Sequence, residues 1–226
     1  MQFSEKFLEA LQDYILFLDK KYPEKAILEL VATRYSLNHF ERSMLFRGII
    51  SREIAERRKL KLVTIEQLNH QILHIDLFNV LFTIAAYLRG FPVYLSADGL
   101  LRDASESHGK GDWEVHLDQG LDLLIEYLTG LNISIAFIYL DGPLRYGLAV
   151  SEKLRDLSMS KLPPAELITD PSPDHLLREA TEGIIATSDS TIIDKSALPV
   201  FDLPKFILVQ AFQPDFISLD NLITNK

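Results

Sequence analysis

The sequence predicts an α/β protein: a three-layer sandwich around a mainly parallel sheet, preceded by a small all-helical module. Up to about residue 61 the apolar residues recur only at helical spacing, whereas from about residue 71 short apolar runs alternate with helical segments. Strands separated by helices are typical of parallel sheets covered on both faces. We therefore expect a helical module at residues 1–61 and an α/β domain at residues 70–226.

Three helices are predicted in the N-terminal module. The first is broken at Tyr22-Pro23, the second starts at Ala26, and Ser36 or Asn38 is placed to cap a third that runs to about Lys59. A helix, a tight turn and a basic helix could enter a groove of nucleic acid. Helices packed on the second domain with a solvated charged face explain the same pattern. The third helix carries the basic residues Arg42, Arg47, Arg52, Arg57, Arg58 and Lys59.

The second domain is predicted to alternate strands with helices. The expected strands are 71–75, 92–95, 133–140, 165–169, 183–186 and 206–210. The expected helices are 79–88, 115–128, 148–157 and 174–180. Residues 105–112 read as a polar, glycine-containing loop, and about the last dozen residues as a poorly ordered tail.

Composition excludes several classes of protein. The chain has no cysteine, which excludes disulfides, thiolate zinc sites and a cysteine nucleophile. Residues 1–61 carry 12 Lys and Arg against 9 Asp and Glu, while the remainder carries 11 against 23. An acidic body disfavours nonspecific binding to phosphate. Because the sequence shows neither a secretory signal nor an apolar run of membrane-spanning length, we expect a soluble, cytoplasmic protein without a membrane partner.

The main functional signal is a set of aspartates that follow apolar runs. Asp76, Asp98, Asp141 and Asp189 each stand in a short turn after such a run. The carboxyl ends of parallel strands meet at one edge of a sheet, where open α/β sheets bind ligands. Crowded carboxylates repel one another unless a cation compensates, and Mg²⁺ or Mn²⁺ prefers oxygen ligands. We therefore expect a divalent-metal site, with Asp103 ranked nearly level with Asp98.

Other interpretations of these residues stay open. An aspartate after a strand is also a common N-cap of the next helix. The histidines lack paired metal-ligand spacing, and the sequence contains no nucleophile elbow, P-loop or GxGxxG. His108, in the glycine-containing loop, is the one histidine for which we consider a function, as a substrate contact or proton donor.

The segments HIDLFNVLFTI, IYLDGP and IATSDSTIID resemble the core of the PIN and NYN-like nuclease superfamily. The chain as a whole resembles a prokaryotic two-domain family catalogued as domain of unknown function 434, with its C-terminal partner domain. This second resemblance is carried by YPEKAILELVATRYSLNHFERSMLFRG in the N-terminal segment and by DLFNVL, DGLLRD, the His-Gly loop, LDGP and ATSDSTIID in the second domain. The first resemblance implies a PIN-like fold, and the second leaves the activity open.

The nuclease resemblance implies a role for individual residues. Asp76, Asp141 and Asp189 would bind Mg²⁺ or Mn²⁺, with Asp98 or Asp103 in a fourth acidic position. Asn79 would orient Asp76, and Thr187 or Ser188 would hold Asp189. The sequence departs from the family pattern at Leu144-Arg145-Tyr146, although Arg145 suits a phosphate contact.

These residues predict a metal-dependent nuclease, with RNA as the expected substrate and Asn79, His108, Arg145 and Ser188 as substrate-binding residues. A non-catalytic binding or scaffold protein with the same fold is one alternative, and a phosphatase that acts on small phosphate esters is another. The apolar helices of the N-terminal module also suggest a surface for a homodimer.

Overall fold

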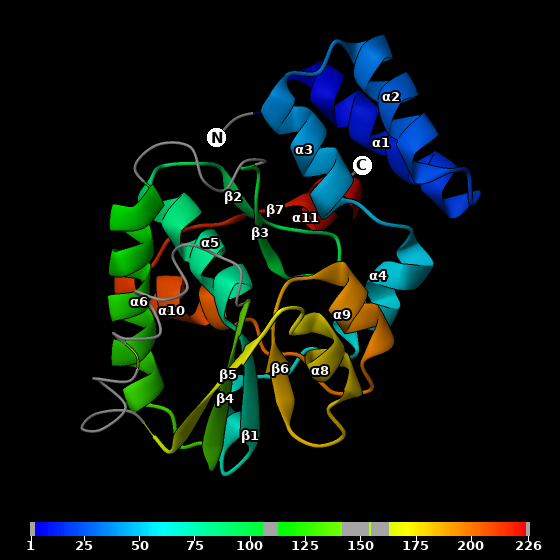
Figure 1. Ribbon diagram of the computed structural model, residues 1–226. Coiled ribbons are helices and arrows are strands. Elements are labelled where there is room, and N and C mark those ends of the chain that lie inside the picture. The colour runs from blue at the N-terminus through cyan, green and yellow to red at the C-terminus, as the bar shows by residue number, and fades with distance from the viewer. Residues whose placement is uncertain (1–2, 106–112, 142–153, 155–162, 225–226) are drawn as a thin grey trace. The chain divides into compact units, whose positions relative to one another are not determined.

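The computed structural model describes residues 3–105, 113–141, 154 and 163–224. The chain divides into two compact units, each formed by segments that are distant in sequence (Figure 1). Unit 1 comprises Met1–Leu60, Gly90–His108 and Asp215–Lys226, and unit 2 comprises Lys61–Arg89 and Gly109–Pro214. The helical module expected at residues 1–61 thus shares its unit with two later segments.

Four helices open unit 1. The first starts at the N-cap Ser4, whose Oγ accepts a hydrogen bond from the amide of Phe7 at 3.2 Å. Asn38 and Glu41 form a capping box at the start of the third. Their apolar faces meet in one core, to which Tyr14 and Met44 contribute fully buried side chains. The helices are α1 (Glu5–Asp19), α2 (Glu24–Tyr35), α3 (His39–Gly48) and α4 (Arg52–Lys59).

The single helix predicted up to Lys59 is wrong, because the chain leaves the helix after Gly48. Ile49 has extended backbone, and the Gly48 carbonyl accepts a hydrogen bond from the amide of Ala97 at 2.8 Å. A Cβ atom on Gly48 would lie 2.5 Å from the Leu219 side chain and 2.6 Å from that of Tyr94. Close packing at Gly48 therefore accompanies the break, although the apolar spacing continues through it.

A second sheet completes unit 1. It has the order β3-β2-β7, in which β2 and β3 are antiparallel and β2 and β7 are parallel. Residues 92–95 were predicted as a strand of the large parallel sheet, but the Asp98-Gly99 turn, with φ of +84° at Gly99, returns the chain into a hairpin. The predicted C-terminal tail instead forms β7 and a helix. The elements are β2 (Val93–Leu95), β3 (Leu101–Asp103), β7 (Ile217–Ser218) and α11 (Leu219–Thr224).

The hairpin turn is fixed by a buried ion-pair cluster around Asp98. Arg102 donates to the two carboxylate oxygens at 2.7 and 2.9 Å, and Arg58 donates to Oδ2 at 3.0 Å. Ser96 donates its hydroxyl to Oδ1 at 2.6 Å. Burial alone would raise the pKa of Asp98, but the Arg102 guanidinium and the other donors hold it well below its usual range.

Unit 2 is built on a four-stranded sheet in which every neighbouring pair is parallel, with the order β5-β4-β1-β6. Helices α5, α6 and α10 lie on one side of the sheet, and α8 and α9 lie on the other (Figure 1). The predicted α/β class, the mainly parallel sheet and the helical N-terminal module are confirmed. The strands are β1 (Ile72–Asp76), β4 (Ile135–Asp141), β5 (Ala165–Asp170) and β6 (Ile184–Ala186).

One strand predicted for this sheet is a helix. Residues 206–210 lie within α10, whose N-cap is Asp202. The Asp202 carboxylate accepts from the amide of Lys205 at 3.1 Å, and Pro204 lies in the first turn. These start signals outweigh the β-like composition of the run. The other helices of unit 2 are η1 (Ile65–Leu68, 3₁₀), α5 (Leu77–Leu88), α6 (Trp113–Thr129), α8 (Asp174–Glu179) and α9 (Ser190–Lys195), with α10 at Leu203–Phe212.

The helix predicted at residues 148–157 lies outside the described residues, apart from Leu154. Among the helices that are described, none has both the length and the apolar content needed to cross a membrane.

Replacing Asp98 with alanine is expected to destabilise the protein by about 3–5 kcal/mol, because Arg58 and Arg102 would remain buried without their shared carboxylate. Glu29→Ala is the control, since its ion pair with Arg42 is solvent-exposed and is expected to contribute about 1 kcal/mol or less. Urea unfolding measures both. Equal losses in the two variants would contradict this account of the cluster.

Gly183→Ala is expected to cost about 1–3 kcal/mol of stability, because Gly183 has a φ of +96° and an added Cβ would lie 2.7 Å from the Ile72 carbonyl oxygen. Gly130→Ala serves as the control, since its added Cβ meets nothing closer than 3.6 Å. Thermal unfolding compares them. A Gly183→Ala protein as stable as the control would show that the start of β6 tolerates a side chain.

Candidate functional site

Acids and hydroxyls gather at the carboxyl edge of the unit 2 sheet. Asp76, Asp141 and Asp170 are the last residues of β1, β4 and β5, and Thr187-Ser188-Asp189 directly follows β6. With the order β5-β4-β1-β6, the chain first builds outward from β1 on one side and then returns to its other side. The ends of β1 and β6 thus flank a topological switch point, where open α/β sheets bind ligands.

The three strand-end aspartates project from the same face of the sheet. Asp76 pairs in register with Tyr139, and Asp141 pairs with Asp170. Since alternate residues of a strand share a face, Tyr139 and Asp141 lie on one face together with Asp76 and Asp170. Asp141 and Asp170 are therefore neighbours, while Asp76 lies one strand away and nearer the middle of the sheet.

Thr187 ties the end of β6 to the end of β1. Its hydroxyl donates to Oδ2 of Asp76 at 2.8 Å, and its oxygen accepts from the backbone amide of Asp189 at 3.0 Å. We expected Thr187 or Ser188 to hold Asp189 and Asn79 to orient Asp76. Thr187 contacts both acids. Asn79 anchors the turn, because its Oδ1 accepts from the amide and the hydroxyl of Ser188, each at 2.8 Å, and its backbone amide acts on Asp76 and lowers the pKa of that carboxyl.

Asp189 is also the N-cap of α9. Its Oδ1 accepts from the amides of Thr191 at 2.6 Å and Ile192 at 3.1 Å. The capping alternative considered from the sequence is thus present at Asp189. Asp76 occupies the N-cap position of α5 but makes no capping hydrogen bond with its side chain. Its carboxylate is oriented mainly by Thr187, and the backbone amide of Asn79 in the first turn of α5 adds a weaker attraction.

The electrostatics at Asp76 favour a protonated carboxyl or a bound cation. Burial, together with the charges of Asp174 and Asp189, raises the pKa of Asp76 from its ordinary 3.8 to about 7, although the hydroxyl of Thr187 and the backbone amide of Asn79 oppose the rise. At neutral pH this carboxyl is therefore close to half ionised. A divalent cation beside it would favour the ionised form.

Asp141 has a carboxylate oxygen without a hydrogen-bond partner in the described part of the chain. This atom, Oδ1, is buried. Buried carboxylate oxygens normally accept a hydrogen bond or bind a metal, so this atom calls for a ligand.

A metal cage made of protein side chains alone does not fit this edge, since no three His, Asp or Glu side chains within the described ranges are grouped closely enough to hold an ion. Mg²⁺ does not need such a cage, because it is commonly held by one or two carboxylates while water and substrate oxygens complete its shell. Asp141 with its unbonded Oδ1, or Asp76 with its raised pKa, fits that kind of site.

The other two predicted acids belong to unit 1 and are engaged there. Asp98 lies between Arg58 and Arg102, as described above. Asp103 is also buried, and its Oδ1 accepts from Arg47 at 3.4 Å and from the amide of Ser105 at 2.9 Å. Because arginines already neutralise these carboxylates, we leave both residues out of the proposed metal site.

Most basic side chains of the predicted basic helix form ion pairs within unit 1. Arg52 pairs with Asp19 at 3.2 Å, and Lys59 pairs with Asp220 at 2.7 Å. Arg42 pairs with Glu29, while Arg47 and Arg58 contact the acids of the hairpin. Because these cations are paired within unit 1, they are less available to the phosphates of a nucleic acid than the sequence suggested.

His108 and Arg145, predicted as substrate contacts, lie outside the described residues. Asp170 was missed, although it directly follows the predicted strand 165–169 and obeys the rule that identified Asp76. Asp174, whose charge acts on Asp76, was also missed, because it was assigned only to a helix. The rule of acids at strand ends could have identified Asp170, which ends β5, but not Asp174, which begins α8.

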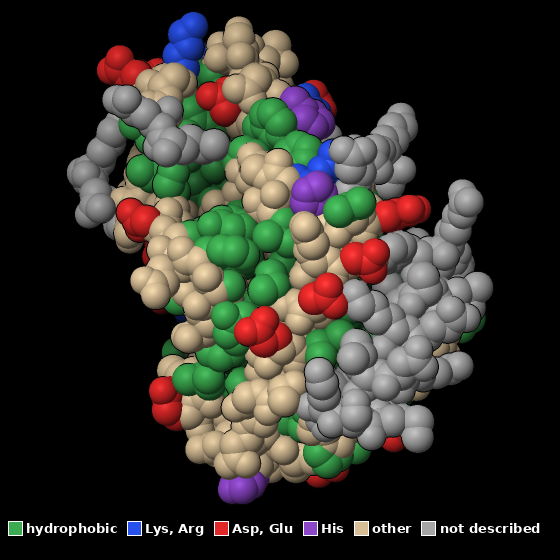
Figure 2. All heavy atoms as spheres, turned by 90° about the vertical axis from the view of Figure 1, so that its left-hand side faces the viewer, with side chains coloured by type: hydrophobic (Ala, Val, Ile, Leu, Met, Phe, Trp, Pro, Cys, Tyr) green, Lys and Arg blue, Asp and Glu red, His purple; other side chains and the backbone are tan. Residues whose placement is uncertain are grey.

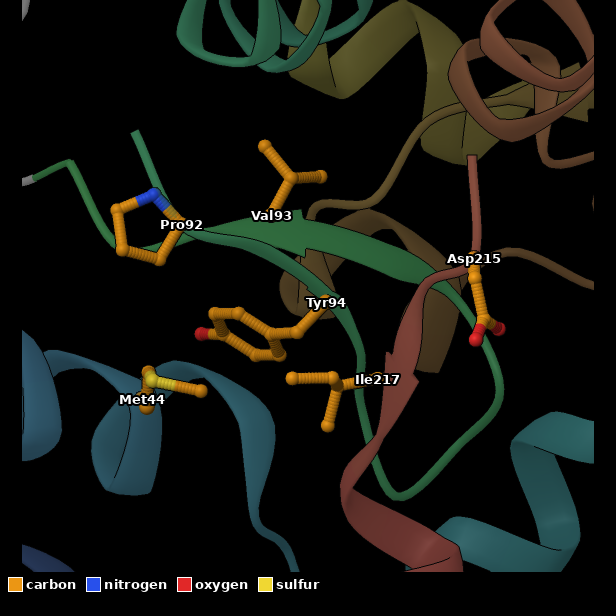
Figure 3. A pocket seen from close by; sticks show the side chains of 6 residues that line it. All are labelled: Met44, Pro92, Val93, Tyr94, Asp215 and Ile217. Carbon is orange, nitrogen blue, oxygen red and sulfur yellow. The ribbon is translucent and has the colours of Figure 1, made fainter. Parts of the chain in front are cut away.

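Unit 1 contains a separate small cavity of about 170 Å³ between α3, β2 and β7 (Figure 3). Tyr94 and Met44 line it and approach each other from β2 and α3, while Asp215 lies apart. The Tyr94 hydroxyl is buried without a hydrogen-bond partner among the described residues. The cavity belongs to unit 1, whereas the strand-end acids belong to unit 2, so we do not place the functional site there.

Comparisons with known proteins agree with the two-part organisation. The model of the domain of unknown function DUF5616 matches residues 65–206, and that of the protein of unknown function DUF434 matches residues 6–61. The uncharacterized protein MJ0935 of Methanocaldococcus jannaschii is 28% identical over 185 residues, which cover 82% of this chain and 88% of that protein. No solved structure matches. The resemblance to a two-domain family of unknown function is confirmed.

Asp76→Asn is expected to stabilise the metal-free protein at pH 8 by roughly 2–4 kcal/mol, since one pKa unit corresponds to about 1.4 kcal/mol. The pKa of Asp76 is raised by folding, so its ionisation opposes folding. The stability of the wild type relative to the variant should fall as pH rises from about 4 to about 7. Below pH 4 the two proteins should be equally stable.

Urea unfolding between pH 4 and pH 8 measures this difference. Asp122→Asn, on the exposed side of α6, is the matched control for loss of a charge. A wild-type protein more stable than Asp76→Asn at pH 8 would show that the carboxyl is not held with a raised pKa.

Proposed function

The chain belongs to the family of the domain of unknown function DUF5616, and from its site we propose that it is a Mg²⁺- or Mn²⁺-dependent nuclease that cleaves RNA. The observation that carries this proposal is the pair of strand-end carboxyls, Asp76 with a raised pKa and Asp141 with a buried, unbonded oxygen. Both lie on one face, at the carboxyl edge of a parallel sheet. Carboxylates of this kind suit a hard cation that also binds phosphate oxygens.

The arrangement of the strands supports a PIN/NYN-like assignment for unit 2. An acid ends the central strand β1, a second ends its neighbour β4, and a Thr-Ser-Asp turn follows β6 on the other side. These are the positions in which the resemblance of the sequence placed metal-binding residues. Asp189 keeps a place near the metal, since its charge acts on Asp76 even though its Oδ1 caps α9.

When bound, a divalent cation would supply an activated water and stabilise the charge that develops on the phosphoryl group. The chain's own residues hold the site in shape. Thr187 fixes one oxygen of Asp76 and the position of Asp189, and Asn79 fixes Ser188 through two hydrogen bonds. Asp141 would coordinate the cation through its Oδ1 atom, which has no hydrogen-bond partner among the described residues.

The charge on unit 2 limits how an anionic substrate approaches. Helix α6 exposes acids four residues apart, at Glu114, Asp118, Asp122 and Glu126. Figure 2 looks onto the side where α6 lies in Figure 1, and a row of acidic side chains is visible there. RNA would avoid that side of unit 2 and reach the acids through a cation. His108 and Arg145 stay as predicted substrate contacts.

A non-catalytic binding protein is the second candidate, favoured by the lack of a three-residue metal cluster among the residues that the structure describes. In that case the acids would still bind a cation weakly, or Asp76 would stay protonated. A phosphatase would use the same edge on small phosphate esters, so p-nitrophenyl phosphate is a suitable substrate for separating it from a nuclease.

We expect the purified protein to cleave single-stranded RNA with Mn²⁺ or Mg²⁺ and to lose activity with chelator. Asp141→Asn should lower the rate roughly a hundredfold or more, because even residues that only support metal ligands contribute about 10–100-fold. Asp122→Asn should cleave at the wild-type rate. Cleavage is followed on end-labelled RNA.

Wild-type activity in Asp141→Asn would exclude the assigned site. Cation binding to the wild type without cleavage of RNA or p-nitrophenyl phosphate would favour the non-catalytic alternative.

A further inference from the structure

An open groove of about 390 Å³ lies on the same face of the unit 2 sheet as the strand-end acids. Its floor is formed by Ile72 and His74 of β1, Phe137 and Tyr139 of β4, and Ile168 of β5. Its wall is formed by the end of α8 and the residues that follow it, up to Glu182. All of these residues belong to unit 2, so the groove is a feature of that unit alone.

The groove lies on the same face of the sheet as the strand-end acids, although none of those acids lines it. His74, Tyr139 and Ile168 are each followed two residues later by Asp76, Asp141 and Asp170, respectively. Two residues of a strand advance the chain by about 6.6 Å and return to the same face. A ligand in the groove would therefore have the acidic edge beside it.

The floor of the groove is aromatic and fixed in position. The rings of His74 and Phe137 stack on each other, with 5.4 Å between centroids and an interplanar angle of 17°, so each covers one face of the other. The His74 Nδ1 atom lies 3.0 Å from the Tyr139 hydroxyl, and Nε2 lies 3.0 Å from the Glu182 carbonyl oxygen. Because His74 is buried and Phe137 is half-buried, Phe137 is the ring on which a planar ligand would stack, and its fixed position limits the freedom lost on binding.

Most of the polar groups around this floor are hydrogen-bond acceptors, and the Thr181 hydroxyl can both accept and donate. A carbonyl oxygen only accepts, so His74 Nε2 carries the proton, and Nδ1 of the neutral ring accepts from the Tyr139 hydroxyl. The Tyr139 oxygen then retains lone pairs for another donor. The side chains of Glu179 and Glu182, which line the groove and are exposed, accept hydrogen bonds when ionised.

We propose that this groove binds a base with an exocyclic amino group, adenine or cytosine above all, from a single-stranded nucleic acid whose phosphate lies at the acidic edge. Aromatic platforms bind bases by stacking, and glutamate accepts hydrogen bonds from base amino groups. The acidic rim repels phosphate, so the backbone is directed past the groove. The inference rests on the proposed nuclease function and names the substrate class of the same site.

Binding measured without metal tests the groove separately from catalysis. The probes are hexa-adenylate and hexa-uridylate RNA and adenosine 5′-monophosphate, titrated calorimetrically into the full chain in EDTA. Hexa-adenylate should bind at least about tenfold more tightly than hexa-uridylate, which lacks the amino group, and more tightly than the monophosphate. If adenosine 5′-monophosphate binds as tightly as hexa-adenylate, the proposal that the groove binds a base of a single-stranded nucleic acid is overturned.

Two variants in the floor sharpen the test. Phe137→Ala should weaken hexa-adenylate binding about tenfold, since one base stacked on an aromatic side chain contributes about 1–3 kcal/mol, and 1.4 kcal/mol corresponds to tenfold. Phe137→Leu, which keeps apolar volume without the flat ring, gives the same test if the alanine variant does not fold. Tyr139→Phe should lower the preference for adenylate over uridylate. Phe212→Ala is the control, since Phe212 is an exposed residue at the end of α10.

The outcomes separate the groove from the nuclease. If the protein cleaves no RNA but Phe137→Ala weakens hexa-adenylate binding, the groove stands and the proposed activity fails. If RNA cleavage depends on Asp141 but both Phe137 variants bind hexa-adenylate as tightly as the wild type, the groove assignment alone is overturned. Hexa-adenylate that does not bind the wild type also overturns it.

Discussion

The parallel pairing of four strands is the constraint on which the candidate site depends. Parallel strands all end at one edge, and the order β5-β4-β1-β6 puts the ends of β4 and β6 on either side of Asp76. The period of two along each strand then decides which side chains share a face. That period places His74 and Tyr139 beside Asp76 and Asp141, so the aromatic groove and the acidic edge are consequences of one register.

Two aspartates show how their surroundings decide the role of a carboxyl. Asp98 is buried and enclosed by Arg58 and Arg102, which hold its pKa low, and its charge fixes a hairpin turn. Asp76 is half-buried beside other acids, and its pKa rises to about 7. The first is a completed ion pair within the chain. The second leaves a need for positive charge that a divalent cation would meet, at the edge where ligands bind.

The sequence predicted this architecture where local patterns agree with tertiary pairing. The alternation of apolar runs with helices identified β1, β4, β5 and β6, and the rule of acids at strand ends found Asp76 and Asp141. It failed where a non-local partner decides. Residues 92–95 form a strand, as predicted, but the Asp98-Gly99 hairpin and β7 at residues 217–218 place that strand in another sheet. Asp98 forms ion pairs with Arg58 and Arg102, and the spacing of these residues in the sequence does not predict that the three meet.

The most direct test is to measure the pKa of Asp76 itself. Carbon NMR of its labelled carboxyl during a pH titration gives this value in the presence and absence of Mg²⁺. In the metal-free protein we predict a value near 7, which falls by more than about one unit when saturating Mg²⁺ favours the ionised form. A metal-free pKa near 4, or a value near 7 that Mg²⁺ leaves unchanged, would contradict a cation site at the carboxyl edge of the sheet.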